Sequence, residues 1–93
     1  YSIININVSN YGTFNLSLVN STEIQQLLNE INNNYYSEPN SQEIINILND
    51  IKQGKEVTPN TLNKLWEFIK KYEPLISISS SLIQTIIAIL GIA

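Results

Sequence analysis

All thirteen charged residues of this chain lie between Glu23 and Glu73, which leaves 22 uncharged residues before them and 20 after them. The last stretch is almost entirely apolar, and a soluble monomer seldom leaves a segment such as residues 75–92 in water. We therefore expect both ends to be buried, either in the core of the chain or against a partner. The pattern indicates packing, assembly or membrane contact rather than catalysis.

The length and composition indicate one domain without the usual catalytic equipment. A chain of 93 residues forms one modest core, so we assign residues 1–93 to a single domain. The sequence contains no cysteine and no histidine, which removes disulfides, thiolate metal sites and the commonest general base. It also lacks glycine-rich phosphate loops and the DxDxG pattern of calcium loops. We expect no enzyme activity, no cofactor and no metal site.

The charge of the chain argues against nucleic acid and anionic lipid as partners. The net charge is −3, and the five basic residues are all lysines, without the arginine that makes bidentate contacts with phosphates and bases. An uncharged apolar segment needs no electrostatic attraction, so the hydrophobic route to a membrane stays open. We expect a second copy or another protein as the partner, with membrane contact as the less favoured alternative.

Residues 2–19 contain two runs in which apolar and polar residues alternate, as in half-buried strands. Between them, Asn10-Tyr11-Gly12 supplies residue types that tolerate positive φ, so the segment predicts an antiparallel hairpin. Its apolar face would carry Ile4, Ile6 and Val8 from the first run and Phe14, Leu16 and Leu18 from the second. Because a lone hairpin is marginal in water, we expect this face to pack on helices or to extend another chain's sheet.

Two capping boxes, Asn20 with Glu23 and Asn40 with Glu43, predict the starts of the first two helices. The first helix should end near the asparagines at positions 32–34, and the second at Gly54. The inward positions at helical spacing are Ile24, Leu27, Leu28 and Ile31 in the first helix and Ile44, Ile47, Leu48 and Ile51 in the second.

Thr58-Pro59 predicts the start of a third helix, because the threonine hydroxyl can cap and proline suits the first helical position. Its apolar stripe consists of Leu62, Leu65, Trp66, Ile69 and Tyr72. Trp66 could stack on a base or a sugar, but its place on the stripe favours a core position. Phe68 lies off this stripe, and we assign it to an interface.

The Glu73-Pro74 step should end the third helix and begin a fourth. Apolar residues cover most of the circumference of this last helix, leaving a narrow polar strip of Ser77, Ser81, Gln84 and Ala88. Three interpretations stay open: a surface for packing between subunits, a central core helix, and a short membrane span.

Together these elements predict an α+β fold, with a β-hairpin over residues 1–20 and a bundle of about four helices over residues 21–93, the last largely apolar. The carboxylates fall at helix starts or on solvated faces, so we expect none of them to be catalytic. Our candidate interface residues are Ile4, Ile6, Val8, Phe14, Leu16, Leu18, Phe68, Ile76, Ile83, Ile87 and Leu90. Asn7, Asn15 and Asn20 begin Asn-x-Ser/Thr sequons and are candidate glycosylation sites, although a chain this rich in these residues forms sequons by chance.

These patterns predict a non-catalytic structural or interaction domain that self-associates through its hairpin and its last helix. The alternatives are a regulatory adaptor module cut from a larger effector, and a small membrane-interacting protein that acts through residues 75–92. The chain begins at Tyr1 instead of methionine. We expect either a processed protein, at the cell surface, outside the cell or in a virion, or a cytoplasmic domain fragment.

Overall fold

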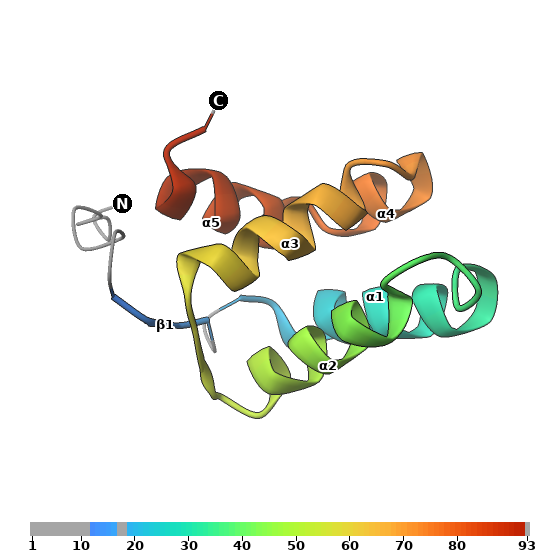
Figure 1. The fold of residues 1–93 in the computed structure, drawn as a ribbon, viewed down its shortest axis with the longest axis horizontal. Coiled ribbons are helices and arrows are strands. Elements are labelled where there is room, and N and C mark those ends of the chain that lie inside the picture. Colours follow the sequence, from blue (N-terminus) through green and yellow to red (C-terminus); the bar gives the residue numbers. More distant parts are fainter. Residues whose placement is uncertain (1–11, 17–18, 93) are drawn as a thin grey trace.

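The computed structural model describes residues 12–16 and 19–92, and over these residues the protein has an α+β fold of five helices and one antiparallel strand pair (Figure 1). The elements in chain order are β1 Phe14–Asn15, α1 Ser21–Asn34, α2 Ser41–Lys52, β2 Glu56–Val57, α3 Pro59–Ile69, α4 Glu73–Ile78 and α5 Ser80–Leu90. The predicted fold class, α+β with a small helical bundle, is confirmed.

The strand pair joins the start of the chain to its middle. In β1, Phe14 lies opposite Val57 and Asn15 lies opposite Glu56 of β2, a segment in which the sequence patterns predicted no strand. Leu16 and Val57 are both buried, so the pair lies against the hydrophobic core. The first run of the predicted hairpin, with Ile4, Ile6 and Val8, lies outside the described residues, as does Leu18.

Local signals place the starts of α1 and α3 as predicted. The Asn20 side chain accepts hydrogen bonds from the backbone N–H groups of Thr22 and Glu23, at 2.9 and 3.3 Å. The Thr58 hydroxyl accepts one from the N–H of Thr61 at 3.1 Å. Each bond satisfies a donor that the first turn of a helix leaves free.

The capping box predicted for α2 is wrong. Asn40 adopts a left-handed backbone with φ 71° and makes no side-chain cap. Instead, the Ser41 hydroxyl donates a hydrogen bond back to the Tyr36 carbonyl, which closes the connecting loop. The end of α2 is as expected, because Gly54 takes the positive φ of 80° that favours glycine after a helix.

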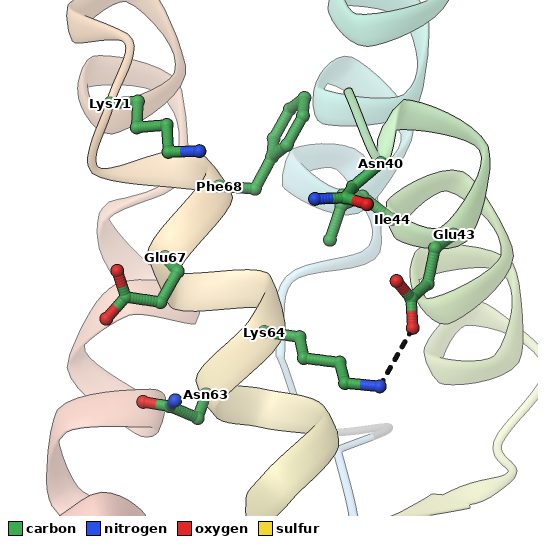
Figure 2. A pocket seen from close by; sticks show the side chains of 8 residues that line it. All are labelled: Asn40, Glu43, Ile44, Asn63, Lys64, Glu67, Phe68 and Lys71. Carbon is green, nitrogen blue, oxygen red and sulfur yellow. Dashed lines mark hydrogen bonds and ion pairs between the residues drawn. The ribbon is translucent and has the colours of Figure 1, made fainter. Parts of the chain in front are cut away.

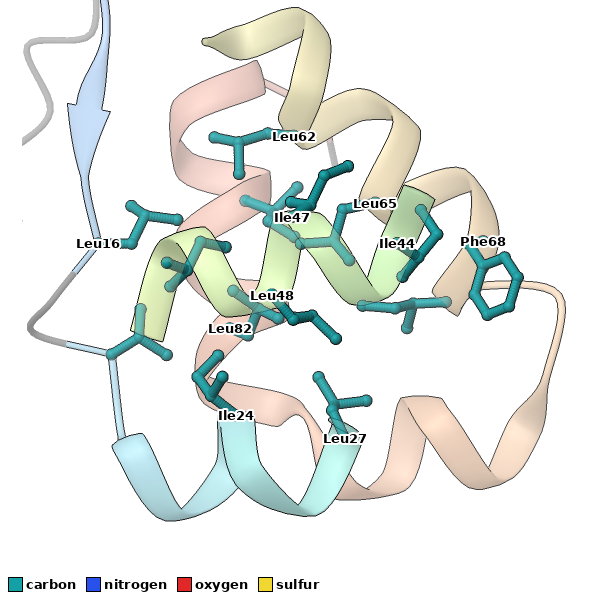
Figure 3. Close-up of a cluster of buried hydrophobic side chains, with 14 of the residues drawn as sticks. Leu16, Ile24, Leu27, Ile44, Ile47, Leu48, Leu62, Leu65, Phe68 and Leu82 are labelled. Carbon is teal, nitrogen blue, oxygen red and sulfur yellow. The ribbon is translucent and has the colours of Figure 1, made fainter. Parts of the chain in front are cut away.

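The helices form two layers with the core between them. In Figure 1, α1 and α2 form one layer, and α3, α4 and α5 form the other. α3 packs against both α2 and α5, and α1 packs against α2, α4 and α5. Figure 3 shows the leucine and isoleucine side chains of these elements converging in one cluster, which includes Leu48, Leu65 and Leu82.

The predicted fourth helix is two helices, because the chain breaks between α4 and α5 at Ser79. The Ser79 backbone has φ −125° and ψ 34°, and its side chain, with 0% of its surface exposed, donates to the Leu75 carbonyl at 2.6 Å. The N-terminus of α5 is capped by a residue from α1. The Glu23 carboxylate accepts from the N–H of Ser81 at 3.2 Å and from that of Leu82 at 2.7 Å. Glu23, which the sequence assigned to the cap of its own helix, therefore caps a distant one.

Candidate interaction surfaces

The first candidate surface is the outward side of α4 and α5. On α5, Leu82, Ile86 and Ile89 are buried in the core, whereas Ile83, Ile87 and Leu90 are half-buried. On α4, Leu75 is buried and Ile76 is 37% exposed. We call Ile76, Ile83, Ile87 and Leu90 the outer set. All four are large apolar side chains that keep part of their surface in solvent.

The candidate interface residues divide into three groups. The outer set lies at the surface of α4 and α5, and Phe14 is half-buried beside the core. Leu16 and Phe68 are buried inside the chain. Ile4, Ile6, Val8 and Leu18 lie outside the described residues.

Phe68 corrects the prediction for α3. It is only 3% exposed, so its expected position off the buried side of α3 is wrong. The reason is that α3 packs on two neighbours, α2 and α5, and therefore buries a wider arc than one stripe. The Phe68 ring meets the Tyr72 ring edge-on, with 5.2 Å between their centroids. Trp66, by contrast, is half-buried against the core and has the Lys70 ammonium 6.0 Å from its ring centroid.

The second candidate surface is a pocket of about 340 Å³ between α2 and α3 (Figure 2). The apolar side chains of Ile44 and Phe68 belong to its lining. Charged side chains form its rim, where Lys64 reaches across to Glu43 and the two make an ion pair of 3.0 Å. Glu67, also in the lining, pairs with Lys70 at 3.1 Å.

The charges of this pocket are exposed and serve mainly to join elements. Both members of the Lys64–Glu43 pair keep about half of their side-chain surface in solvent, 51% and 47%. An exposed pair of this kind is worth little energetically. The Lys64–Glu43 pair therefore bridges α2 and α3 at the rim of the pocket.

The remaining carboxylates are dispersed over the surface. Among the residues that the structure describes, no three acidic side chains come together in a way that could hold a metal ion. Glu38 accepts a hydrogen bond from the Tyr72 hydroxyl at 3.0 Å, and Asp50 lies 3.6 Å from the Lys55 ammonium. Each of these contacts joins neighbouring parts of the chain.

Two of the three sequon asparagines can be placed. Asn15 is exposed in β1, and Asn20 is exposed at the start of α1, where its side-chain oxygen is the cap. Asn7 lies outside the described residues. Glycosylation of Asn15 and Asn20 stays a prediction.

The split of the last helix also bears on the membrane alternative. Within residues 12–16 and 19–92, no helix is both long enough and apolar enough to cross a membrane. α5, the more apolar part, has only 11 residues.

The contact that the sequence patterns did not indicate is that of Glu23 with α5. The spacing of Glu23 from Asn20 already explained its position as part of a capping box, so no local signal pointed to α5.

No protein-family model matches the chain, and no curated protein or solved structure was found to be similar to it.

Proposed function

We propose that this protein is a non-catalytic interaction domain that self-associates through the outward side of α4 and α5. The observation that carries the proposal is the outer set, in which Ile76, Ile83, Ile87 and Leu90 remain partly in solvent after the core is complete. Ile92, which follows α5, is a further apolar side chain at 36% exposure. Covering these side chains removes apolar surface from water, which is the main driving force of protein association.

Charge favours a second copy as the occupant of this surface. The chain has a net charge of −3, but no charged residue occurs after Glu73. Two copies that meet along α5 therefore bring no charged side chain of α5 itself into contact, and the Glu23 carboxylate beside its first turn is already bonded to the N–H groups of Ser81 and Leu82. A single face of an 11-residue helix gives an interface at the small end of the known range, so we expect weak, concentration-dependent association.

The test compares one lysine substitution on this surface with the same substitution elsewhere. Ile87→Lys places a charge in the outer set, whereas Gln26→Lys places it on the exposed side of α1. We expect the mass measured by light scattering to rise with concentration for the wild type and for Gln26→Lys, and to stay at one copy for Ile87→Lys. A wild-type chain that remains monomeric at millimolar concentration would contradict self-association and turn attention to a foreign protein partner.

A point substitution is a better test than deletion of the last helices. Truncation before Pro74 removes Leu75, Leu82 and Ile86, all fully buried, from the core. Loss of association in such a variant would follow from unfolding alone. Ile87 is half-buried and lies outside the core cluster, so we expect its replacement by lysine to leave the fold in place.

A further inference from the structure

The segment from Glu73 to Leu90 is built as two helices, although its apolar spacing is that of one. At about 100° per residue, Leu75, Leu82, Ile86 and Ile89 fall on one face of a continuous helix. All four are buried in the structure. No glycine or proline occurs between Leu75 and Leu90. The serines at positions 79–81 favour a break, because their hydroxyls compete for backbone groups, but they do not fix one, so the break at Ser79 needs a further cause.

The Glu23 carboxylate provides this cause. In a continuous helix the N–H groups of Ser81 and Leu82 would donate to the carbonyls of Ser77 and Ile78, four residues earlier. In the structure they donate to Glu23, at 3.2 and 2.7 Å. Both bonds have a charged acceptor, and they lie at the N-terminus of α5, where the helix dipole favours a negative charge.

Ser79 makes a matching exchange on the other side of the break. In a continuous helix the Leu75 carbonyl would accept from the backbone N–H of Ser79. Here it accepts from the Ser79 hydroxyl at 2.6 Å, while the Ser79 N–H donates to the Ile76 carbonyl at 3.3 Å. The same N–H donors thus have two alternative sets of acceptors. One set belongs to the bent segment seen in the structure, and the other belongs to a straight, continuous helix.

We propose that residues 73–90 form a two-state element in which Glu23 is the latch that holds the bent state. Release of the latch joins α4 and α5 into one helix of 18 residues, about 27 Å long. In that helix Ile76, Ile83, Ile87 and Leu90 fall within an arc of about 60° and form one continuous row.

The regulatory consequence rests on the proposed self-association. A second copy that covers the whole outer set binds the straight state better, whereas Glu23 stabilises the bent state. The latch therefore opposes association, and its loss favours association, because a partner shifts an equilibrium toward the state to which it binds more tightly.

The experiment uses the full chain with Glu23→Gln, and Glu43→Gln as the matched control. Both positions are the third residue of a helix, and both substitutions remove one negative charge from a first helical turn. Glu43 contacts Lys64 of α3 and none of the residues at the break. The conformation is read from the Cα chemical shift of Ser79 and the amide shifts of Ser81 and Leu82, at a concentration where the chain is monomeric. Light scattering on the same samples measures association.

We expect Glu23→Gln to move the Ser79 Cα shift toward helical values, while Glu43→Gln leaves it at the wild-type position. Glutamine keeps one acceptor oxygen, so the substitution removes one of the two charge-assisted bonds and leaves the other neutral. Loss of one bond to a charged group changes an equilibrium by about 10- to 100-fold, and the bent-to-straight ratio should fall by at least the lower figure. Association of Glu23→Gln should then begin at a lower concentration than that of the wild type.

If Glu23→Gln is folded and the chemical shifts of Ser79, Ser81 and Leu82 are unchanged, Glu23 does not hold the bent state, whatever mass is measured. If the signals shift in Glu23→Gln but the wild type and both variants stay monomeric, the role of Glu23 in the bent state is supported. The proposed self-association is then contradicted.

If Glu23→Gln loses its fold, two substitutions at Ser79, made with Glu23 in place, test whether residues 73–90 have two states. Alanine stabilises a continuous helix by about 1 kcal/mol more than glycine does. This difference corresponds to about a fivefold change in the bent-to-straight ratio. Ser79→Ala should move the amide shifts of Ser81 and Leu82 toward the straight state, and Ser79→Gly should not. Identical shifts in the two variants would contradict a two-state segment.

Discussion

Tyr72 joins the connection between α1 and α2 to the start of α4. Its ring lies 4.7 Å from the Tyr35 ring, and its hydroxyl donates to Glu38 at 3.0 Å. Loss of hydration around the phenol raises the pKa of Tyr72 above its ordinary value, and the hydrogen bond to Glu38, the Glu38 charge and Tyr35 act in the same direction. All of these effects favour the protonated phenol in the folded chain.

This direction predicts how stability depends on pH. Because the folded pKa of Tyr72 is higher than the unfolded one, its contribution is complete below about pH 10 and is lost as pH rises through the folded pKa. Urea unfolding across this range should show a smaller loss of stability for Tyr72→Phe than for the wild type. Tyr36→Phe, at an exposed site with a hydroxyl bonded to Gln42, is the control and should follow the wild type. Parallel losses for Tyr72→Phe and the wild type would show that another group causes the pH dependence.

At the scale of the element, α3 shows how a helix start is set locally while its buried surface is set by its neighbours. Thr58 caps the first turn and Pro59 follows it, so the start needs no contact from elsewhere. Leu62, Leu65 and Ile69 are fully buried on the predicted stripe. Phe68 is buried as well, because α3 packs on more than one neighbour, and its ring lies on the side that faces α2 (Figure 2).

The cap of α3 carries a prediction for stability. Thr58→Ala removes the acceptor of the Thr61 N–H, and we expect it to lower the free energy of unfolding by about 1 kcal/mol. Thr61→Ala removes a hydroxyl that contacts Thr58 but leaves the capping bond, so its effect should stay within about 0.5 kcal/mol. Urea denaturation of the two variants measures both values. Equal losses would mean that the cap contributes no more than a surface hydroxyl.

At the scale of the whole molecule, α4 and α5 are part of the only core cluster found within the described residues. Leu75, Leu82 and Ile86 are fully buried there beside Leu27, Leu48 and Leu65 from α1, α2 and α3 (Figure 3). The segment of α4 and α5 is therefore part of the core, as one of the three interpretations of the sequence expected, while packing between subunits stays a prediction. One side of α4 and α5 is buried in the core, and the other leaves the outer set partly in solvent.

This double role predicts two very different responses on one helix. Leu82→Ala leaves a cavity in the core and should lower the free energy of unfolding by about 2–5 kcal/mol. Ile87→Ala, five residues further along α5, removes a half-buried side chain outside the core cluster and should cost about 1 kcal/mol or less. Thermal or urea unfolding of both variants, at a concentration where the chain is monomeric, measures the two losses of stability. Similar losses at both sites would show that the outward side of α5 is as tightly packed as the inward side.

Local patterns in the sequence determined the features that depend on residues only a few positions apart. The caps at Asn20 and Thr58, the stop at Gly54 and the inward stripes of α1 and α2 belong to this class. Their physical basis is a hydrogen bond or a side-chain phase inside one helix, which is complete in the local sequence.

Only the tertiary structure decided the features that depend on distant residues. These are the pairing of β1 with β2, the burial of Phe68 and the break at Ser79. The last case is the clearest, because Glu23 lies 58 and 59 positions before the two N–H groups that it caps. A helical periodicity reports which residues share a face, but it carries no information on an acceptor from another element that competes for the same backbone donors.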